Sequence, residues 1–167
     1  MEFRKTEHKD VENVMEIIEQ SQQYFKEQGV DQWQNGYPNE DTIKEDISKD
    51  HSYVLLKDNK IVATTALSFD GEETYNEIHD GKWLSNDDYA VIHRIAVNTN
   101  YKGLGLAGEI IKEAEKKCSE RNIKSIKVDT HKDNISMQKL LEKNGFKYCG
   151  IIYLSDGDTR IAFEKML

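Results

Sequence analysis

The stretch that decides the fold is His93-Arg-Ile-Ala-Val-Asn-Thr-Asn-Tyr-Lys-Gly-Leu-Gly-Leu-Ala-Gly-Glu109. Its pattern predicts a strand over residues 89–97, a short polar loop, and a helix whose first turn carries Gly103 and Gly105. The first backbone N–H groups of such a helix are unpaired, and the helix dipole adds positive potential there. We therefore expect an anion site, most often a phosphate site, to which Lys102 would add a full positive charge.

The composition indicates a single acidic domain over residues 1–167. The chain has 23 basic and 31 acidic residues, a net charge of -8, and no basic stripe, so no nucleic-acid partner is expected. No segment approaches the ~20 apolar residues of a membrane span, and we expect a cytoplasmic protein without membrane contact. Cys118 and Cys149 lie far apart without metal-ligand spacing, so no metal is expected.

The hydrophobic pattern predicts strands and helices along the whole chain. Val11, Val14, Met15 and Ile18, for example, fall on one face of a helix. The expected strands are residues 3–6, 53–56, 61–69, 89–97, 125–130, 146–154 and 160–165, and the expected helices begin near residues 11, 40, 103 and 135. Three consecutive strands followed by strand-helix-strand crossovers predict the α/β (α+β) class, with a mixed, mostly antiparallel central sheet of about seven strands flanked by helices.

The phosphate ligand could be a dinucleotide, because Gly103-Leu-Gly105-Leu-Ala-Gly108 matches the Gly-x-Gly-x-x-Gly fingerprint and Asp129 follows at the end of the next strand. The context argues against this alternative. The fingerprint should follow its strand immediately, yet residues 98–102 intervene. It should also open a series of strand-helix-strand units, and only about one more follows. A P-loop is excluded because no Gly-Lys-Ser/Thr follows.

Two motifs carry a resemblance to a known family. Lys102-Gly-Leu-Gly105-Leu-Ala107 resembles the acyl-CoA-binding motif of the GNAT superfamily of N-acyltransferases, Arg/Gln-x-x-Gly-x-Gly/Ala, with lysine in place of arginine or glutamine. Asn134-Ile-Ser-Met137-Gln-Lys-Leu140-Leu141-Glu-Lys143-Asn-Gly145-Phe146 is similar to the second motif of the family, Asn-x-x-Ala-x-x-Leu-Tyr-x-Lys-x-Gly-Phe. The order of the expected elements also agrees with that fold over nearly the whole chain.

The resemblance implies acetyl-CoA as the acyl donor, bound where two neighbouring parallel strands splay apart. The backbone of three strand residues would pair with the pantetheine arm, and the N–H groups of the glycine turn would hold the pyrophosphate. The implied cofactor residues are Ile95, Ala96, Val97, Lys102, Gly103, Leu104, Gly105, Leu106, Ala107, Asn134 and Met137. A helix N-cap is the alternative role of Asn134, and both roles are compatible because the cap uses one side-chain oxygen.

Transfer of an acyl group to an amine requires a neutral amine, so a general base is useful. His93 is the first candidate, since it lies two residues before Ile95 and some members of the family, notably the arylalkylamine acetyltransferases, have a histidine there. Asp129 and His131, at the end of the neighbouring strand, are second candidates. For each, the alternative is a structural role: a half-buried histidine bonded to a backbone carbonyl, or a polar cluster at the start of a loop.

The proton donor for the leaving thiolate is where the sequence departs from the resemblance. A tyrosine commonly fills this role in the second motif, and Leu141 stands at its position. Either another hydroxyl, such as Ser136 or Tyr153, protonates the thiolate, or the thiolate leaves unassisted, which a thiol pKa of ~8.5 permits.

The acceptor would lie against polar loops that carry aromatic and acidic side chains. The candidate residues are Trp33, Tyr37, Tyr75 and Glu77, and the last is also a weaker candidate base. The aromatic side chains could instead cover an edge of the core. We therefore expect an N-acetyltransferase that moves an acetyl group from coenzyme A to a primary amine of a small molecule, amino acid or peptide in a ternary complex. A CoA-binding sensor or interaction module without catalysis is the alternative, and the sequence leaves open whether the chain forms a homodimer.

Overall fold

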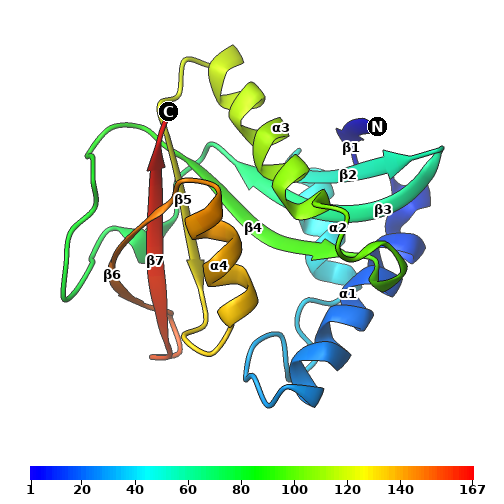
Figure 1. Cartoon of the computed structure of the whole chain (residues 1–167), viewed down its shortest axis with the longest axis horizontal. Helices are drawn as coiled ribbons and strands as arrows, with labels where there is room; N and C mark the ends of the chain where they lie inside the picture. Colours follow the sequence, from blue (N-terminus) through cyan, green and yellow to red (C-terminus); the bar gives the residue numbers. More distant parts are fainter. The chain divides into compact units, whose positions relative to one another are not determined.

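The computed structural model describes all 167 residues and contains seven strands and four helices (Figure 1). The strands are β1 (Glu2–Lys5), β2 (Ser52–Lys57), β3 (Lys60–Ser68), β4 (Ala90–Val97), β5 (Ser125–Thr130), β6 (Lys147–Tyr153) and β7 (Thr159–Met166). The helices are α1 (Val11–Glu27), α2 (Glu40–Ser48), α3 (Leu106–Glu120) and α4 (Ile135–Lys143), with short 3-10 turns η1 (His8–Asp10), η2 (Glu73–Tyr75) and η3 (Thr99–Tyr101). The order of strands and helices is the predicted one.

The strands form one mixed sheet in the order β1-β2-β3-β4-β5-β7-β6. The pairs β1–β2, β2–β3, β5–β7 and β6–β7 are antiparallel, and β4–β5 is parallel. The turn between β2 and β3 is made by Asp58 and Asn59, both at positive φ, which is the conformation of a tight hairpin turn. The predicted fold class, a mostly antiparallel sheet flanked by helices, is confirmed.

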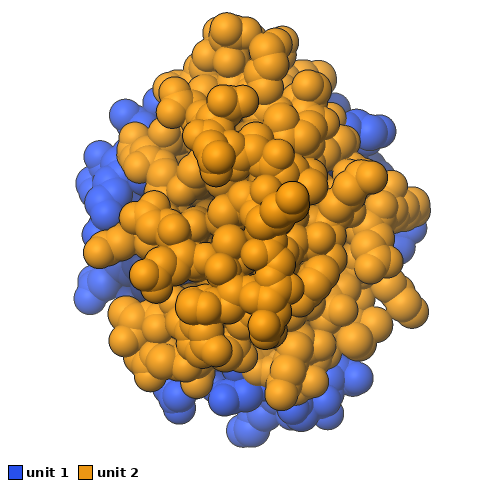
Figure 2. All heavy atoms as spheres, turned by 90° about the vertical axis from the view of Figure 1, so that its left-hand side faces the viewer, with its two compact units in different colours: residues 1–67, 94–113 blue, residues 68–93, 114–167 orange.

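The chain divides into two compact units (Figure 2). The first unit comprises residues 1–67 and 94–113, and the second comprises residues 68–93 and 114–167. The boundaries fall at the last residue of β3 and within β4 and α3. Each unit has its own hydrophobic core. The single domain expected over residues 1–167 stays a prediction.

Within the first unit, apolar side chains pack on both faces of the strands. On β2, Val54 belongs to a cluster with α1 and α2, whereas the next residue, Leu55, belongs to a cluster with α3. This alternation is expected because successive strand side chains point to opposite faces. The buried stripe of α1 differs slightly from the prediction: Ile17 is fully buried, and Met15 is only partly buried at the edge of the cluster.

The start of α1 is fixed by a buried carboxylate. Asp10 accepts hydrogen bonds from both terminal nitrogens of Arg4, at 2.7 and 3.2 Å, and from the backbone N–H of Glu7 at 2.8 Å. Burial would raise the pKa of Asp10, but these hydrogen bonds outweigh it and hold the pKa below its ordinary value. The ion pair therefore attaches β1 to the first turn of the helix.

The second unit buries both faces of β5, although the sequence alternates between apolar and polar residues there. Lys127 is 4% exposed, and its ammonium lies 4.4 Å from the ring centroid of Trp83 and 4.0 Å from that of Tyr89. Its cross-strand partner Glu164 is also fully buried and accepts hydrogen bonds from Ser85 and Ser125. The irregular segment before β4 thus covers the polar face of β5.

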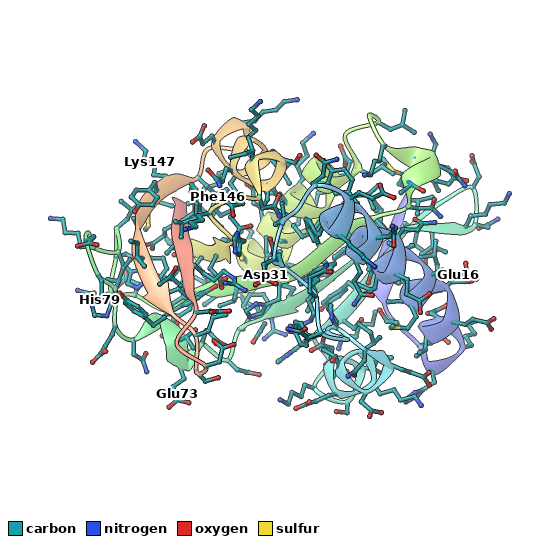
Figure 3. All side chains as sticks on the ribbon, turned by 90° about the horizontal axis from the view of Figure 1, so that it is seen from below. Glu16, Asp31, Glu73, His79, Phe146 and Lys147 are labelled. Carbon is teal, nitrogen blue, oxygen red and sulfur yellow. The ribbon has the colours of Figure 1, made fainter.

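That irregular segment, residues 69–89, is attached to the strands of the second unit by its backbone. His79 exchanges two backbone hydrogen bonds of 2.8 Å with Ile151, and Gly81 lies so close to Cys149 that a Cβ there would be 1.9 Å from the Cys149 carbonyl oxygen. The side chains of Glu73 and His79 are labelled on this segment in Figure 3. None of the helices combines the length and apolar character that a membrane span requires.

Candidate functional site

The glycine turn after β4 has the geometry of an anion site. Gly103 and Gly105 have φ values of +81° and +73°, and a Cβ built on either would meet no atom within 4 Å. The glycines are therefore required by the backbone conformation and not by lack of space. The prediction placed them in the first turn of the helix, but residues at positive φ cannot be helical, and α3 begins at Leu106.

The first N–H groups of α3 have no helical partner. The first bond into the helix runs from the N–H of Glu109 to the carbonyl of Gly105 at 3.1 Å, so the N–H groups before it have no carbonyl of the helix to pair with. The helix is 15 residues long, and Leu106 anchors its start in the core at 3% exposure. The turn thus presents several backbone donors on a rigid support.

The side chains of the last residues of β4 are used for packing. Ala96 is buried in the cluster with α1 and α2, whereas Ile95 and Val97 pack against the cluster that includes Leu106 of α3. Because the side chains go to the cores on either face, a ligand that lies along this strand would meet its backbone. Such a strand suits the pairing with a pantetheine arm that the resemblance implies.

The loop before the turn is held by α1. The backbone N–H of Thr99 donates to the side chain of Gln20 at 2.9 Å, and the ammonium of Lys102 lies 4.0 Å from the ring centroid of Tyr24. Lys102 is itself exposed. Its position over an aromatic face leaves the charge solvated and next to the glycine turn, as a phosphate-binding lysine requires.

A groove of about 570 Å³ lies along α1 on the first unit. It is lined by Glu16, Glu19, Gln20, Gln23, Tyr24, Glu27 and Thr99. Glu16 is labelled on α1 in Figure 3. Three glutamates make this groove unfavourable for a phosphate, so the groove is not where we expect the pyrophosphate.

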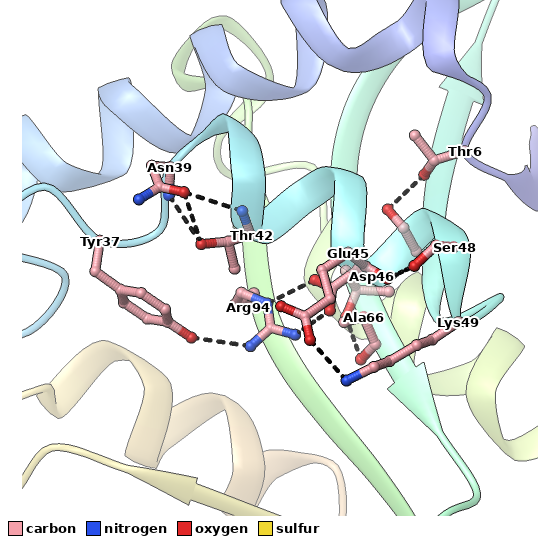
Figure 4. Close-up of polar contacts among 12 residues, drawn as sticks. Thr6, Tyr37, Asn39, Thr42, Glu45, Asp46, Ser48, Lys49, Ala66 and Arg94 are labelled. Carbon is pink, nitrogen blue, oxygen red and sulfur yellow. Dashed lines mark hydrogen bonds and ion pairs between the residues drawn. The ribbon is translucent and has the colours of Figure 1, made fainter.

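Arg94 joins three elements of the first unit in a polar network (Figure 4). Its Nε and Nη2 donate to the two carboxylate oxygens of Asp46 on α2, at 2.9 and 2.6 Å, and its Nη1 donates to the hydroxyl of Tyr37 at 3.0 Å. Burial by itself would lower the pKa of Arg94, but Tyr37 and Asp46 outweigh it and raise the pKa above its ordinary value. Arg94 also has a φ of +54°, a conformation that costs about 1–3 kcal/mol in a residue with a side chain.

The predicted acceptor loop carries Trp33 and Tyr37 in different environments. Trp33 is partly buried and packs its ring edge-on against Phe25 of α1, with 5.7 Å between centroids. Tyr37 is 45% exposed. The loop is further tied to α1 by Gln22, which donates to the carbonyl of Pro38 at 3.0 Å. Trp33 therefore covers the core, and Tyr37 is the aromatic side chain of this loop that a ligand can reach.

In the second unit, the structure brings Asp129 together with Tyr75. Tyr75 donates its hydroxyl proton to Oδ2 of Asp129 at 2.6 Å, and its own backbone carbonyl accepts from the indole N–H of Trp83. Burial raises the pKa of Asp129, and the hydrogen bond from Tyr75 opposes that rise only in part. Tyr75 is 2% exposed. Of the two roles predicted for Tyr75, a contact to the acceptor or a cover for an edge of the core, this burial favours the second, and the hydroxyl group bonds to Asp129.

His131 has one ring nitrogen committed to the loop that follows β5. Its Nδ1 accepts from the backbone N–H of Asp133 at 3.0 Å, so a neutral ring carries its proton on Nε2. That tautomer can donate but has no free basic nitrogen. His131 thus contributes one ring nitrogen to the loop, and the roles of Asp129 and His131 as bases stay predictions.

The other two candidate bases, His93 and Glu77, differ in how far they are buried. His93 is the fourth residue of β4 and is partly buried, whereas Glu77 lies after η2 and is exposed. A half-buried imidazole on a strand is consistent with either a base or a structural histidine. The exposure of Glu77 disfavours it as a base, because solvent screens its charge.

The second motif covers the N-cap of α4, the whole helix and the turn that follows it. Asn134 is 6% exposed, and its side-chain oxygen accepts from the N–H of Met137 at 3.1 Å, which is the predicted N-cap. Met137 is partly buried in the first turn. Leu141 is completely buried. The position where the family commonly has a tyrosine is therefore a core position in this chain.

Reasoning from the sequence missed two contacts of the candidate site, the hydrogen bond between Tyr75 and Asp129 and the ion pair between Asp46 and Arg94. The bond between Tyr75 and Asp129 joins residues 54 positions apart, and no local pattern predicts it. The burial of Asp46 did leave a signal: it follows Ile43 by three residues and precedes Ile47 by one, so it lies on the apolar face of α2. A carboxylate on such a face indicates a buried cationic partner.

Comparison with known proteins agrees with this geometry. A model of the acetyltransferase (GNAT) family matches residues 14–146. An acetyltransferase of the GNAT family from Streptococcus agalactiae 2603 superimposes with a TM-score of 0.90 at 31% identity, over 99% of this chain and 95% of that one. The uncharacterized N-acetyltransferase YesJ of Bacillus subtilis (strain 168) is 22% identical over 95% of this chain and 86% of its own length. The chain belongs to the GNAT family and is an N-acetyltransferase by class.

Proposed function

We propose that this enzyme transfers an acetyl group from acetyl-CoA to the primary amine of a small molecule, amino acid or peptide by direct transfer in a ternary complex. The observation that carries the proposal is the turn with Gly103 and Gly105 at positive φ between β4 and the N-terminus of α3. When bound, the coenzyme would supply an acetyl group activated as a thioester and a thiol leaving group.

The residues of the first unit fit the coenzyme. Backbone donors of Gly103 to Ala107 face an anion with the help of the dipole of α3, and Lys102 adds a charge that solvates a phosphate. The backbone of Ile95 to Val97 would pair with the amide groups of the pantetheine arm, and an N–H in this stretch would polarise the thioester carbonyl. The resemblance also implies contacts from Asn134 and Met137, which belong to the second unit.

The base is assigned to Asp129 or His93. A raised pKa makes Asp129 a better proton acceptor than an ordinary carboxylate, and Tyr75 orients it through Oδ2 while Oδ1 is left for the amine or for a water molecule between them. His93 acts from β4 itself. Help from a general base is worth ~10²–10⁴-fold in rate.

The acid is not Leu141, which is buried and has no proton to give. Tyr153 and Ser136 are both exposed and carry hydroxyl groups. Alternatively the thiolate leaves unassisted and takes a proton from water, as a thiol pKa near ~8.5 allows.

The test is thiol release from acetyl-CoA in the presence of a panel of amines, amino acids and peptides. At least one amine should accelerate release, and Asp129→Asn or His93→Gln should lower the rate at saturating coenzyme. CoA binding, measured by calorimetry, should survive both substitutions. Binding of CoA without acceleration by any amine would favour the sensor or interaction module over the enzyme.

A further inference from the structure

The hydroxyl of Tyr37 is held beside β4 by Arg94, which is paired in turn with Asp46. The coenzyme and base assignments leave both charged side chains unused. Arg94 is the residue of β4 just before Ile95, and Asp46 contacts it from α2. The side chains of Arg94 and Asp46 are 16% and 9% exposed, whereas Tyr37 is 45% exposed. A buried ion pair thus supports an exposed phenol (Figure 4).

We propose that Arg94 is a positioning residue of the acceptor site: it fixes Tyr37, and with it the loop at residues 28–39, next to the strand that carries the proposed acetyl donor. The inference rests on the proposed function, because an acceptor site has meaning only for a transferase. It adds a specificity-determining contact that the GNAT motifs do not contain.

The geometry explains why this task requires arginine. A planar guanidinium donates two parallel hydrogen bonds to the Asp46 carboxylate and has a third edge left for Tyr37. A lysine ammonium has no such fork, so it could satisfy one partner well but not both. Because Asp46 balances the charge, the network offers the acceptor a hydroxyl group and not a strong cation.

The direction of the hydrogen bond determines what Tyr37 can recognise. Its phenolic oxygen accepts from Arg94, so its own proton is directed elsewhere. The attacking amine needs its lone pair for the acetyl carbon and cannot accept that proton at the same time. Tyr37 therefore binds a second atom of the acceptor, and a carbonyl or carboxylate oxygen close to the amine meets this requirement.

The loop is built to hold this geometry. Besides Tyr37, its residues Trp33 and Pro38 are attached to α1, through Phe25 and Gln22 respectively. Asn39 ends the loop as the N-cap of α2 and accepts from the N–H of Thr42 at 3.0 Å. Arg94 attaches the loop to β4 through Tyr37. Substitution of Arg94 should therefore free the loop from β4 and leave its attachments to α1 and α2 in place.

The first experiment measures amide hydrogen exchange of residues 28–39 in the coenzyme-free full chain. Arg94→Lys keeps the charge and Tyr37→Phe keeps the ring, and each should speed exchange in this loop by about tenfold, the scale of one lost charge-assisted hydrogen bond. Glu45→Gln is the matched control: it breaks the exposed pair with Lys49 on the same helix and should leave the loop unchanged. Exchange in Tyr37→Phe equal to wild type overturns the inference even if Arg94→Lys folds poorly.

The second experiment separates the acceptor from the coenzyme. In both variants the KM for the amine should rise by about tenfold, while the KM for acetyl-CoA and the calorimetric affinity for CoA stay unchanged. In the double variant the KM for the amine should rise no further than in the single variant with the larger rise. Phenylalanine amide should also be preferred over 2-phenylethylamine by the wild type, with the preference lost in Tyr37→Phe.

The two proposals fail in different ways. Absence of thiol release from wild type with any amine overturns acetyl transfer. Additive effects in the double variant, or a rise in the KM for acetyl-CoA instead of the amine, overturn the role of Arg94 in an enzyme that is fully active.

Discussion

The hydroxyl of Tyr75 donates to Oδ2 of Asp129 at 2.6 Å; Tyr75 is buried, and Asp129 is partly buried. Burial raises the pKa of the carboxyl group, and the phenol counteracts part of that rise by stabilising the charged form. Two opposing influences therefore set the proton affinity of the proposed base, and each can be removed by substitution.

Removal of the phenol should make Asp129 harder to ionise. Tyr75→Phe raises the pKa of Asp129 because the hydrogen bond that lowers it is gone, so the acidic limb of the kcat/KM profile should move to higher pH. Tyr148→Phe, an exposed tyrosine of the same unit, is the control and should leave the profile in place. An unchanged limb in Tyr75→Phe would mean that the limb reports another group, with His93 the first to examine.

Neutralising Asp129 should stabilise the fold at neutral pH. Because the folded state raises this pKa above its ordinary value of 3.8, the native protein binds more protons than the unfolded chain above pH 3.8, and stability falls as pH rises toward the folded pKa. Each unit of elevation is worth about 1.4 kcal/mol. The Tm of Asp129→Asn relative to wild type should therefore increase from pH 3.5 to pH 7. A difference that is constant with pH would contradict the raised pKa.

Substitution of the turn glycines should weaken coenzyme binding beyond its effect on stability. Gly103→Ala and Gly105→Ala meet no atom within 4 Å but force a side chain to positive φ, which costs about 1 kcal/mol. A turn that relaxes to avoid this strain misdirects its N–H groups, and the affinity for CoA should fall about tenfold or more by calorimetry. Gly157→Ala, at φ +91° in the turn before β7, is the matched control. It should lose similar stability with no loss of affinity.

The ion pair between Arg4 and Asp10 should stabilise the fold at neutral pH and lose this effect in acid. Asp10→Asn leaves Arg4 without its buried partner and should cost about 2 kcal/mol at pH 7, toward the low end for such pairs because Arg4 is partly exposed. The pKa of Asp10 is lowered in the folded state, so this contribution is present above pH 3.8 and is lost as pH falls through the folded pKa. Denaturant titrations at pH 7 and pH 3 measure it. Glu45→Gln, in an exposed pair, should cost at most about 0.5 kcal/mol.

Most of the fold was predictable because its signals are local. Alternation, helix periodicity, the Asp58-Asn59 turn and the cap at Asn134 each depend on a few neighbouring residues. Gly103 and Gly105 were also recognisable, since positive φ is what glycine provides. The error in the start of α3 has the same origin: a glycine at positive φ ends or precedes a helix, and the sequence alone does not say which.

The tertiary contacts of the site were not predictable to the same extent. The pair of Tyr75 with Asp129 and the link from Tyr37 to Arg94 each join residues more than 50 positions apart. Tyr75 looked like an exposed aromatic residue because its neighbours are acidic, whereas its ring is covered by Trp83 and Tyr89. Such burial depends on which segments meet in the fold, and the residues next to Tyr75 in the sequence do not predict it.

The placement of the two tryptophans gives each compact unit its own fluorophore. Trp33 lies against Phe25 in the first unit, and Trp83 lies against Tyr75 in the second. With one tryptophan replaced by phenylalanine, the emission of the other reports the opening of a single unit. Coincident denaturation curves from the two variants would describe one cooperative domain, and separated curves would describe a chain whose halves melt independently.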